Sequence, residues 1–292
     1  MNKNKILIFG YGYTSSFLSS LLVKEGWAVF ATTREEESFS RIKKNGAHPI
    51  LFSDTKEIEK TISKGVYVLC SIPPAKGGDP VLNEYSSLIL EKKDFIFWLG
   101  YFSTTSIYGD KMGGWVTEET VPSPSLPRSI ERLKVENSWR RLSKDSGISL
   151  NIFRLSGIYG PGRSLVDRFN AGENIIVVDR PNQLFNRVHV IDIVAITYLA
   201  MKKKFKNEVF NVSDDNPASQ VEVSEFARSL SKSRPIKKVS LESDLISNMA
   251  KSFYLEEKKV SNKFVKKKLG YVFKFPSFSE GLRDIYEKTI KV

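Results

Sequence analysis

The first residues in the chain that could take part in chemistry form the segment Gly10-Tyr11-Gly12-Tyr13-Thr14-Ser15. A glycine at its first position permits a tight turn, and a glycine at its third lets the backbone approach a diphosphate closely. The small side chain of Ser15 allows a following helix to pack against the preceding strand. The N-terminus of that helix presents N–H groups and a partial positive charge to phosphate. We therefore predict a dinucleotide-binding turn, with contacts from Gly10, Gly12, Tyr13, Thr14 and Ser15.

The elements on either side of this segment are those that a dinucleotide-binding turn requires. An apolar run, Lys5–Phe9, is typical of a buried parallel strand. Apolar residues recur at helical spacing from Phe17 to Leu22, and Gly26 ends the helix before a second apolar run, Trp27–Thr33. A glycine-rich turn that holds no ligand is the alternative, but the strand–turn–helix context favours a dinucleotide.

The end of the second strand is where such folds bind the adenosine ribose of the cofactor. An acidic residue there binds the 2′-hydroxyl of NAD, whereas an arginine accommodates the 2′-phosphate of NADP. The chain has Thr32, Thr33 and Arg34 at this place, and Glu35–Glu37 follow directly. Thr33 and Arg34 favour NADP, while NAD stays possible because of the acidic residues, which also suit the start of a helix.

Apolar runs and helical patterns continue to alternate along the chain. Strands are expected over residues 48–52, 66–72, 95–102, 148–154, 187–190 and 208–212, and helices over 129–146, from 192, over 219–231 and from 277. This alternation predicts an α/β fold, a Rossmann-type doubly wound parallel sheet with a smaller C-terminal α/β part.

Loops that follow parallel strands lie at the carboxyl edge of the sheet, where open α/β folds bind ligands. We therefore expect Asp54, after the third strand, to contact the cofactor. The same is expected of Ser71, Ile72 and Pro73, at the end of the fourth strand. Asp54 would serve equally well as the N-cap of the next helix.

The amino-acid composition indicates where in the cell the protein is expected to be and which classes of partner it is expected to bind. The 292 residues include one cysteine, Cys70, so an internal disulfide is excluded and a reducing, cytoplasmic location is expected. Cys70 ends an apolar run and is expected to be a small core residue. Neither residues 1–5 nor any later stretch has the long apolar segment of a signal peptide or a membrane span. The net charge of +12 suits an anionic ligand, but no helix concentrates basic and aromatic residues, which disfavours nucleic acid as a partner.

Several later segments carry a family resemblance when they are taken in order. They are the hydroxyl-rich segment Ser103–Gly109, the loop with Glu118, Pro122 and Pro124, the turn Arg154–Gly162, the segment Val188–Asp192 and the strand Phe210–Val212. Together they resemble the extended short-chain dehydrogenase/reductase superfamily, the NAD(P)-dependent epimerase/dehydratase group, although the G-x-G turn is atypical. The resemblance implies a Rossmann cofactor domain over residues 1–162 and 186–212, and a smaller substrate-binding lid over 163–185 and 213–292.

The group that this chain resembles depends on a triad of Ser or Thr, Tyr and Lys. The tyrosine is the general acid/base, and the lysine lowers its pKa and binds the nicotinamide ribose. The resemblance places the first triad member at Thr104, and alignment on Glu136 places the other two at Arg128 and Arg132. Arg132 would keep the ribose contact, but Arg128 cannot donate a proton because a guanidinium stays charged.

The missing tyrosine leaves two functions open. In an NADP-dependent oxidoreductase or epimerase, Tyr108 or Tyr101 would replace the acid, since both lie near the carboxyl end of the fifth strand. A place in the core or in a loop is the commoner role for such aromatic residues. The alternative is a catalytically degenerate NADP-binding sensor or regulatory protein.

On the substrate side, four residues lie in segments that are expected to face the cleft: Arg163, Asn186, Arg187 and His189. Arginines suit a carboxylate or phosphate, although surface ion pairs explain them equally well. A small polar substrate is expected, and nucleotide sugars dominate the group that the chain resembles. No Cys/His or Asp spacing indicates a metal site, and a monomer or a homodimer is expected.

Overall fold

The computed structural model describes residues 4–203 and 205–290, and the chain folds into two compact units. The first unit contains the residues up to Thr104, Ile130–Arg154 and Val194–Phe210. The second contains Thr105–Ser129, Leu155–Ile193 and the residues from Asn211 onward. This division differs from the boundaries expected from the sequence, because residues 105–129, 155–162, 186–193 and 211–212 group with the second unit. A substrate-binding role for the second unit stays a prediction.

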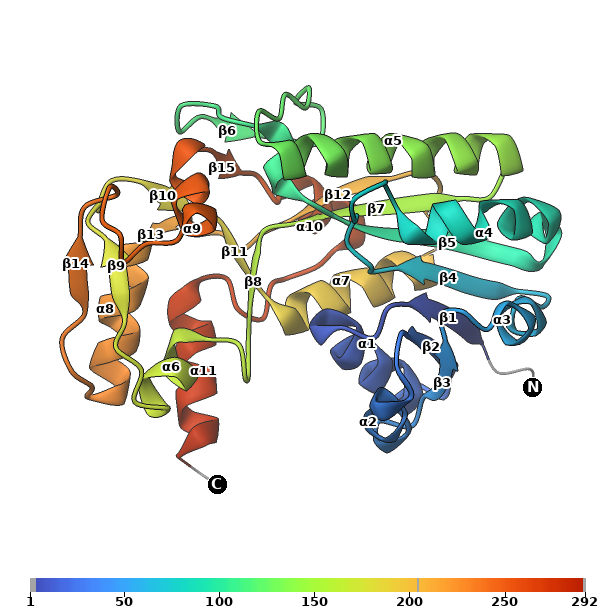
Figure 1. Ribbon diagram of the computed structural model, residues 1–292, viewed down its shortest axis with the longest axis horizontal. Helices are drawn as coiled ribbons and strands as arrows, with labels where there is room; N and C mark the ends of the chain where they lie inside the picture. Colours follow the sequence, from blue (N-terminus) through green and yellow to red (C-terminus); the bar gives the residue numbers. More distant parts are fainter. Residues whose placement is uncertain (1–3, 204, 291–292) are drawn as a thin grey trace. The chain divides into compact units, whose positions relative to one another are not determined.

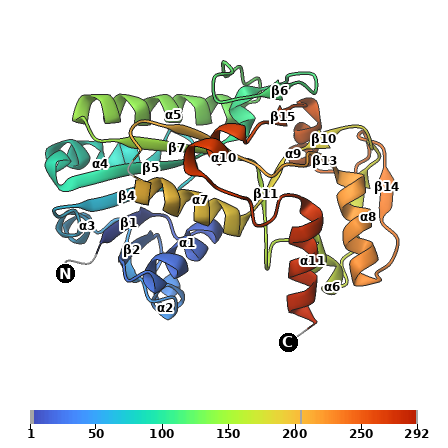
Figure 2. The ribbon, with the colours of Figure 1, turned by 180° about the vertical axis from the view of Figure 1, so that it is seen from behind.

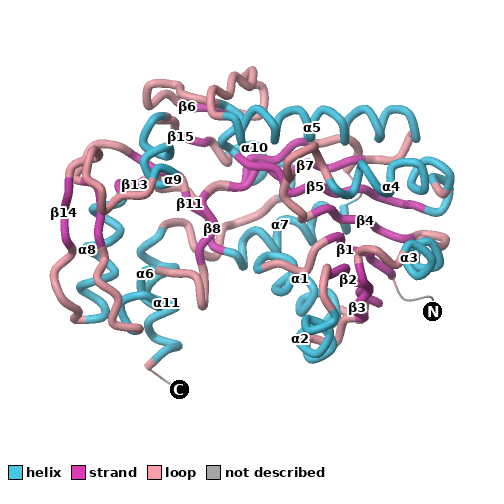
Figure 3. The backbone as a smooth tube through the Cα atoms, in the orientation of Figure 1, coloured by secondary structure: helices cyan, strands magenta, loops and turns pink. Residues whose placement is uncertain are grey.

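Strands and helices alternate through the first unit (Figures 1 and 3). Its N-terminal elements are β1 (Lys5–Phe9), α1 (Tyr13–Lys24), β2 (Ala28–Thr33), α2 (Phe39–Lys44), β3 (His48–Leu51), α3 (Thr55–Thr61), β4 (Val66–Cys70), α4 (Pro80–Glu91) and β5 (Ile96–Thr104). Four further elements belong to it for most or part of their length: α5 (Pro127–Ser146), β7 (Leu150–Leu155), α7 (Val190–Lys203) and β12 (Val209–Val212).

Seven strands form one sheet in the order β12-β7-β5-β4-β1-β2-β3. β1 pairs in parallel with β2 and β4, so that Lys5 lies opposite Ala28 on one side and Val66 on the other. The pairs β2–β3 and β4–β5 are parallel as well. The strand order reverses between β1 and β4, which is the place where open α/β sheets bind ligands. The predicted Rossmann-type sheet is confirmed.

Helices α3, α4 and α5 cover one face of the sheet, and α1 lies on the other (Figures 1 and 2). The ring of Tyr85 in α4 stacks on that of Phe9 in β1, with ring centroids 5.3 Å apart. Trp139 of α5 stacks on Tyr101 of β5 at 5.9 Å. Cys70 is fully buried in this core, which confirms its expected place.

The second unit is built from short strand pairs and a group of helices. Its elements are β6 (Trp115–Val116), β8 (Gly157–Tyr159), α6 (Leu165–Asn170), β9 (Ile176–Val178), β10 (Leu184–Phe185), β11 (Arg187–His189), β13 (Ala218–Ser219), α8 (Gln220–Ser231), β14 (Lys237–Val239), α9 (Asn248–Ser252), β15 (Lys259–Val260), α10 (Lys263–Leu269) and α11 (Phe278–Thr289). Helices α6, α8 and α11 pack together (Figure 2). Their shared core includes Val166, Phe169, Phe278 and Leu282.

The turn after β5 contains Gly109, which lies very close to the backbone of Ser123. Gly109 has a φ of +71°, and a Cβ on it would lie 2.0 Å from the carbonyl oxygen of Ser123. Gly26 has a similar φ of +81°, but nothing lies within 4 Å of the same position. We expect Gly26→Ala to lower the free energy of unfolding by about 1 kcal/mol, and Gly109→Ala by about 3 kcal/mol, because only the second meets backbone. Urea denaturation measures both, and equal losses would contradict the close approach at Gly109.

Candidate functional site

The glycine-rich turn between β1 and α1 lies close to the end of β4. Gly10 has a φ of +93°, and a Cβ on it would stand 2.7 Å from Cγ1 of Ile72. Its N–H donates to the side-chain oxygen of Thr32 over 3.0 Å. Gly10 is therefore required both by its backbone conformation and by the residues beside it.

Gly12 has a different reason to be glycine. It is the N-cap residue of α1, with a φ of −86° that any residue can adopt, and it supplies no side-chain cap. A Cβ on it would meet nothing within 4 Å. Packing within the protein does not require this glycine, and the space in front of the helix is open. Such a helix N-terminus attracts anions, because its N–H groups and the helix dipole are directed at that space.

Ser15 fills the small-residue position that the sequence pattern requires. Its side chain is buried, as is that of Thr14 beside it, while the ring of Tyr13 lies against Phe17. The hydroxyl oxygens of Ser15 and Ser71 are 2.6 Å apart. Ser71 also donates to the carbonyl oxygen of Gly10 over 2.8 Å. These bonds join α1, the turn and the residue that follows β4.

A cation that the sequence did not point to lies beside the turn. Nη2 of Arg41, in α2, donates to the carbonyl oxygen of Tyr11 over 3.2 Å, and the guanidinium stands 5.6 Å from the centre of the Tyr11 ring. Arg34, after β2, is exposed, and the hydroxyl of Thr33 donates to the carbonyl oxygen of Glu35 over 3.3 Å. No sequence motif places Arg41 here, because the packing of α2 decides its position.

Three residues expected at the cofactor edge have different surroundings. Asp54 is the N-cap of α3, where its Oδ1 accepts the N–H of Glu57 over 3.1 Å. This is the capping role that the sequence allowed as an alternative to an adenine contact. Ile72 packs against Gly10, and Pro73 is exposed. The structure thus brings Ile72 to the turn and engages the carboxylate of Asp54 in a helix cap.

The carboxyl end of β5 carries Thr104 and receives Arg132 from α5. Nη1 of Arg132 donates to the hydroxyl of Tyr101 over 3.1 Å and to the carbonyl oxygen of Phe102 over 3.2 Å. Thr104 is the last residue of β5 and is half-buried. Tyr101 is fully buried, and burial raises the pKa of its phenol although Arg132 opposes the shift. Tyr101 therefore has the surroundings of a core aromatic residue.

One turn further along α5, a buried carboxylate holds the helix against β5 and β7. Glu136 is fully buried and accepts from Ser103 over 2.8 Å, from Nη2 of Arg154 over 2.6 Å and from Nη2 of Arg140 over 3.0 Å. Burial alone would raise the pKa of Glu136, but these bonds and the Arg154 charge outweigh it and lower the pKa. Arg132 lies one turn away on the same face of α5, so this network holds the helix that carries Arg132.

Two residues of the second unit, Tyr108 and Arg128, are relevant to the catalytic tyrosine that the family resemblance leads us to expect. Tyr108 is fully buried, and its hydroxyl donates to Oδ1 of Asn211 over 2.7 Å. Arg128, where the family resemblance places the tyrosine, is exposed, and its guanidinium lies 4.0 Å from the centre of the Phe253 ring. Arg128 is therefore held by a cation–π contact.

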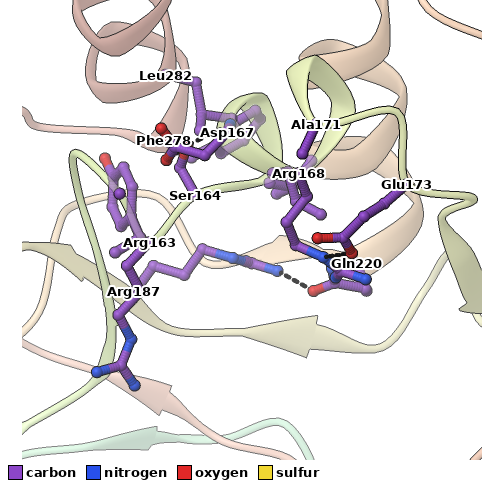
Figure 4. A pocket seen from close by; sticks show the side chains of 14 residues that line it. Arg163, Ser164, Asp167, Arg168, Ala171, Glu173, Arg187, Gln220, Phe278 and Leu282 are labelled. Atoms are coloured by element: carbon purple, nitrogen blue, oxygen red, sulfur yellow. Dashed lines mark hydrogen bonds and ion pairs between the residues drawn. The ribbon is translucent and has the colours of Figure 1, made fainter.

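A pocket of about 550 Å³ in the second unit is lined by Arg163 and Arg187, two of the expected substrate residues (Figure 4). Nη1 of Arg187 donates to the carbonyl oxygens of Phe185 and Ala218 over 3.0 and 2.7 Å, and its Nη2 donates to Oε1 of Gln220 over 2.9 Å. Burial lowers the pKa of Arg187. The guanidinium is thus fixed at the wall of the pocket.

The other two expected substrate residues do not line this pocket. Nδ2 of Asn186 donates to the carbonyl oxygen of Lys258 over 2.7 Å, and its Oδ1 accepts the N–H of Val260 over 2.8 Å. His189 is 1% exposed, its ring centroid lies 4.0 Å from that of Phe275, and burial lowers its pKa to about 4. Asn186 joins β11 to β15, and His189 is a neutral core residue.

The described part of the chain holds neither a metal-binding cluster nor a membrane-spanning helix. Over residues 4–203 and 205–290, no three or more His, Cys, Asp or Glu side chains are grouped to hold a metal ion. None of the helices described there combines the length and the apolar character that a membrane crossing needs.

The Glu136 network can be tested by its effect on stability. Glu136→Gln removes the charge that balances Arg154, whose side chain is 4% exposed, and we expect a loss of about 3–5 kcal/mol in the free energy of unfolding. Glu131→Gln is the matched control, because its pair with Lys134 is 3.7 Å long and the lysine is 70% exposed; it should change stability by less than about 0.5 kcal/mol. Urea denaturation of both variants measures the difference, and a small loss for Glu136→Gln would refute the network.

Comparisons with known proteins agree with the architecture. The chain is 25% identical over 285 residues to protein YeeZ of Escherichia coli (strain K12), covering 93% of this chain and 96% of that protein. It is 33% identical to a conserved protein of unknown function from Silicibacter pomeroyi DSS, with a TM-score of 0.91 and coverage of 98% and 99%.

Two further solved structures have the same fold. They are UDP-glucose 4-epimerase from Thermotoga maritima with UDP-glucose (20% identity, TM-score 0.78, coverage 98% and 99%) and dTDP-glucose 4,6-dehydratase from Bacillus anthracis str. Ames with NAD (18% identity, TM-score 0.79, coverage 99% and 97%). The model of the NAD-dependent epimerase/dehydratase family matches residues 92–213. The chain therefore belongs to the same family as the Silicibacter pomeroyi protein, and its residues 92–213 match the NAD-dependent epimerase/dehydratase family.

Proposed function

We propose that this protein is an NAD(P)-dependent oxidoreductase or epimerase/dehydratase that acts on a small polar substrate. The observation that carries the proposal is the turn after β1, where α1 begins without a side-chain cap and Gly12 faces open space. A diphosphate in that space would accept hydrogen bonds from the backbone N–H groups. The presence of NAD in the Bacillus anthracis dehydratase supports the same class of cofactor.

Within this class we propose NADP. The exposed guanidinium of Arg34 directly follows β2, where a 2′-phosphate would lie, and Arg41 adds a second cation beside the turn. Neither position offers a carboxylate to a 2′-hydroxyl. NADPH should therefore bind about tenfold more tightly than NADH, a difference that corresponds to about 1.4 kcal/mol.

In the catalytic step, we propose that Arg132 binds the nicotinamide ribose as a fixed cation and that the hydroxyl of Thr104 orients the reacting oxygen of the substrate. The bonds of Arg132 to Tyr101 and to the carbonyl oxygen of Phe102 support this role, because they hold the guanidinium at the end of β5. For the substrate we propose a nucleotide sugar. The UDP-glucose in the Thermotoga maritima epimerase supports this choice.

A second function is favoured by the surroundings of the expected acid. Tyr108 is fully buried and bonded to Asn211, which suits a structural phenol better than a proton donor. Arg128, in the place of the family tyrosine, is stacked on Phe253 and stays charged. A protein that binds NADP and regulates a partner, without turnover, would need neither residue as an acid.

Cofactor binding is tested by filling the open space at the turn. Gly12→Val puts two methyl groups where the diphosphate would lie, at a backbone conformation that valine accepts, and should weaken NADPH binding at least a hundredfold in a fluorescence titration. Ser20→Val, two turns further along α1, is the control and should leave the dissociation constant within about twofold. Unchanged affinity in Gly12→Val, with the fold intact by circular dichroism, would contradict the proposed site.

A measurement of catalytic turnover distinguishes the proposed enzyme from the proposed regulatory protein. For the enzyme we expect NADPH oxidation, or epimerisation of UDP-glucose, that falls at least a hundredfold in Thr104→Ala while NADPH affinity is kept, because the hydroxyl acts on the reacting atom. Arg128→Ala is the control and should keep the rate. If the wild-type protein binds NADPH without any turnover of UDP-sugars, the regulator is the better account.

A further inference from the structure

A second pocket in the second unit lies beside the short β6–β15 pair and the start of α10. Its volume is about 560 Å³, and its walls include Trp115, Asp214, Asn262 and Lys263. We call it the Asp214 pocket. It shares no lining residue with the pocket of Arg187 and includes none of the residues assigned to the cofactor.

The buried carboxyl of Asp214 is the feature that points to a ligand. Asp214 is 2% exposed, and one of its oxygens, Oδ1, accepts the N–H of Asn216 over 3.3 Å. The other oxygen, Oδ2, is buried and has no hydrogen-bond partner among residues 4–203 and 205–290. A buried polar atom without a partner is costly, and a ligand hydroxyl would supply the missing bond. Burial, opposed by the charge of Arg187, raises the pKa of Asp214 to about 8.

Beside it, the carboxamide of Asn262 has a fixed orientation. Its Nδ2 donates to the carbonyl oxygen of Ser213 over 2.9 Å and to Oδ1 of Asp215 over 2.7 Å. Both amide protons are used in this way, and the side chain caps no N–H of α10. The carbonyl oxygen of Asn262 is therefore positioned to accept a hydrogen bond from a ligand.

Trp115 gives the pocket an apolar platform. It is 58% exposed, whereas Trp27, Trp98 and Trp139 are at most 8% exposed. The ammonium group of Lys259 lies 5.5 Å from the centre of the Trp115 ring, and Lys263 lines the pocket. A ring with C–H groups on one face suits the indole, and a negatively charged substituent suits the lysines.

We propose that the Asp214 pocket is a second binding site, which takes a polyhydroxylated ring compound, a free sugar or a sugar phosphate. The ring would lie on Trp115, and its hydroxyls would bond to Asp214 and Asn262. The site is separate from the cofactor turn and shares no lining residue with the Arg187 pocket, although the backbone N–H of Asp214 donates to the carbonyl oxygen of Arg187 over 2.7 Å.

Saturation-transfer NMR on the 292-residue protein, without nucleotide, tests the site. The probes are glucose, glucose 6-phosphate and inorganic phosphate. We expect a saturable signal from the ring protons of a sugar, and Asp214→Ala and Trp115→Ala should each weaken binding at least tenfold. Trp115 is exposed, so its variant keeps the test valid if Asp214→Ala does not fold. Tighter binding of glucose 6-phosphate than of glucose would identify a sugar phosphate as the ligand class. Tighter binding of glucose would identify a free sugar.

Two control variants show whether the sugar binds in the Asp214 pocket or elsewhere. Asp244→Ala removes an exposed carboxylate outside the pocket and should leave the affinity unchanged. Gln220→Ala alters the Arg187 pocket and should also leave it unchanged. The proposal is overturned if neither sugar binds, if inorganic phosphate competes as well as the sugar phosphate, or if Gln220→Ala rather than Asp214→Ala removes the signal. Each of these results leaves the test of the cofactor turn untouched.

Discussion

The close packing of α1 against the carboxyl ends of β1 and β4 is the constraint on which the first unit depends. Gly10 leaves no room for a Cβ beside Ile72, and the hydroxyls of Ser15 and Ser71 meet at 2.6 Å. Larger side chains at these positions would push the helix away from the sheet and change the direction of its first N–H groups. Gly12 is different, because no atom in the described part of the chain lies within 4 Å of a Cβ placed on it. A turn that packs closely against Ile72 at Gly10 and is open to solvent at Gly12 is suited to hold a diphosphate.

A second group of hydrogen bonds, centred on Glu136, holds α5 at the carboxyl end of β5. Glu136 collects hydrogen bonds from Ser103, Arg140 and Arg154, and so joins α5 to β5 and β7. Arg132 lies one helical turn away and reaches the end of β5. The buried carboxylate of Glu136 therefore holds the helix that carries the cation proposed for the ribose. Under the proposed function, an arginine, with its planar array of donors, makes the ribose contact that the family resemblance assigns to a lysine.

Much of this arrangement was predictable from local sequence patterns. The alternating apolar and helical patterns predicted the sheet, and α5 differs from expectation mainly by beginning at Pro127, where a proline fits the first turn of a helix. Cys70 and the capping role of Asp54 also follow from their neighbours along the chain. Arg41 was missed because the packing of α2 brings it to Tyr11, and no local pattern encodes that contact. His189 was expected to face a substrate, but a histidine in a strand-like segment gives no sign of which side is buried.

The central claim is that the turn at Gly12 holds the diphosphate of a pyridine dinucleotide. A crystal structure of the protein with NADPH tests it most directly. The account predicts diphosphate oxygens within hydrogen-bonding distance of backbone N–H groups at the start of α1, with the 2′-phosphate beside Arg34. A nucleotide bound elsewhere, or a turn left empty at saturating NADPH, would contradict it.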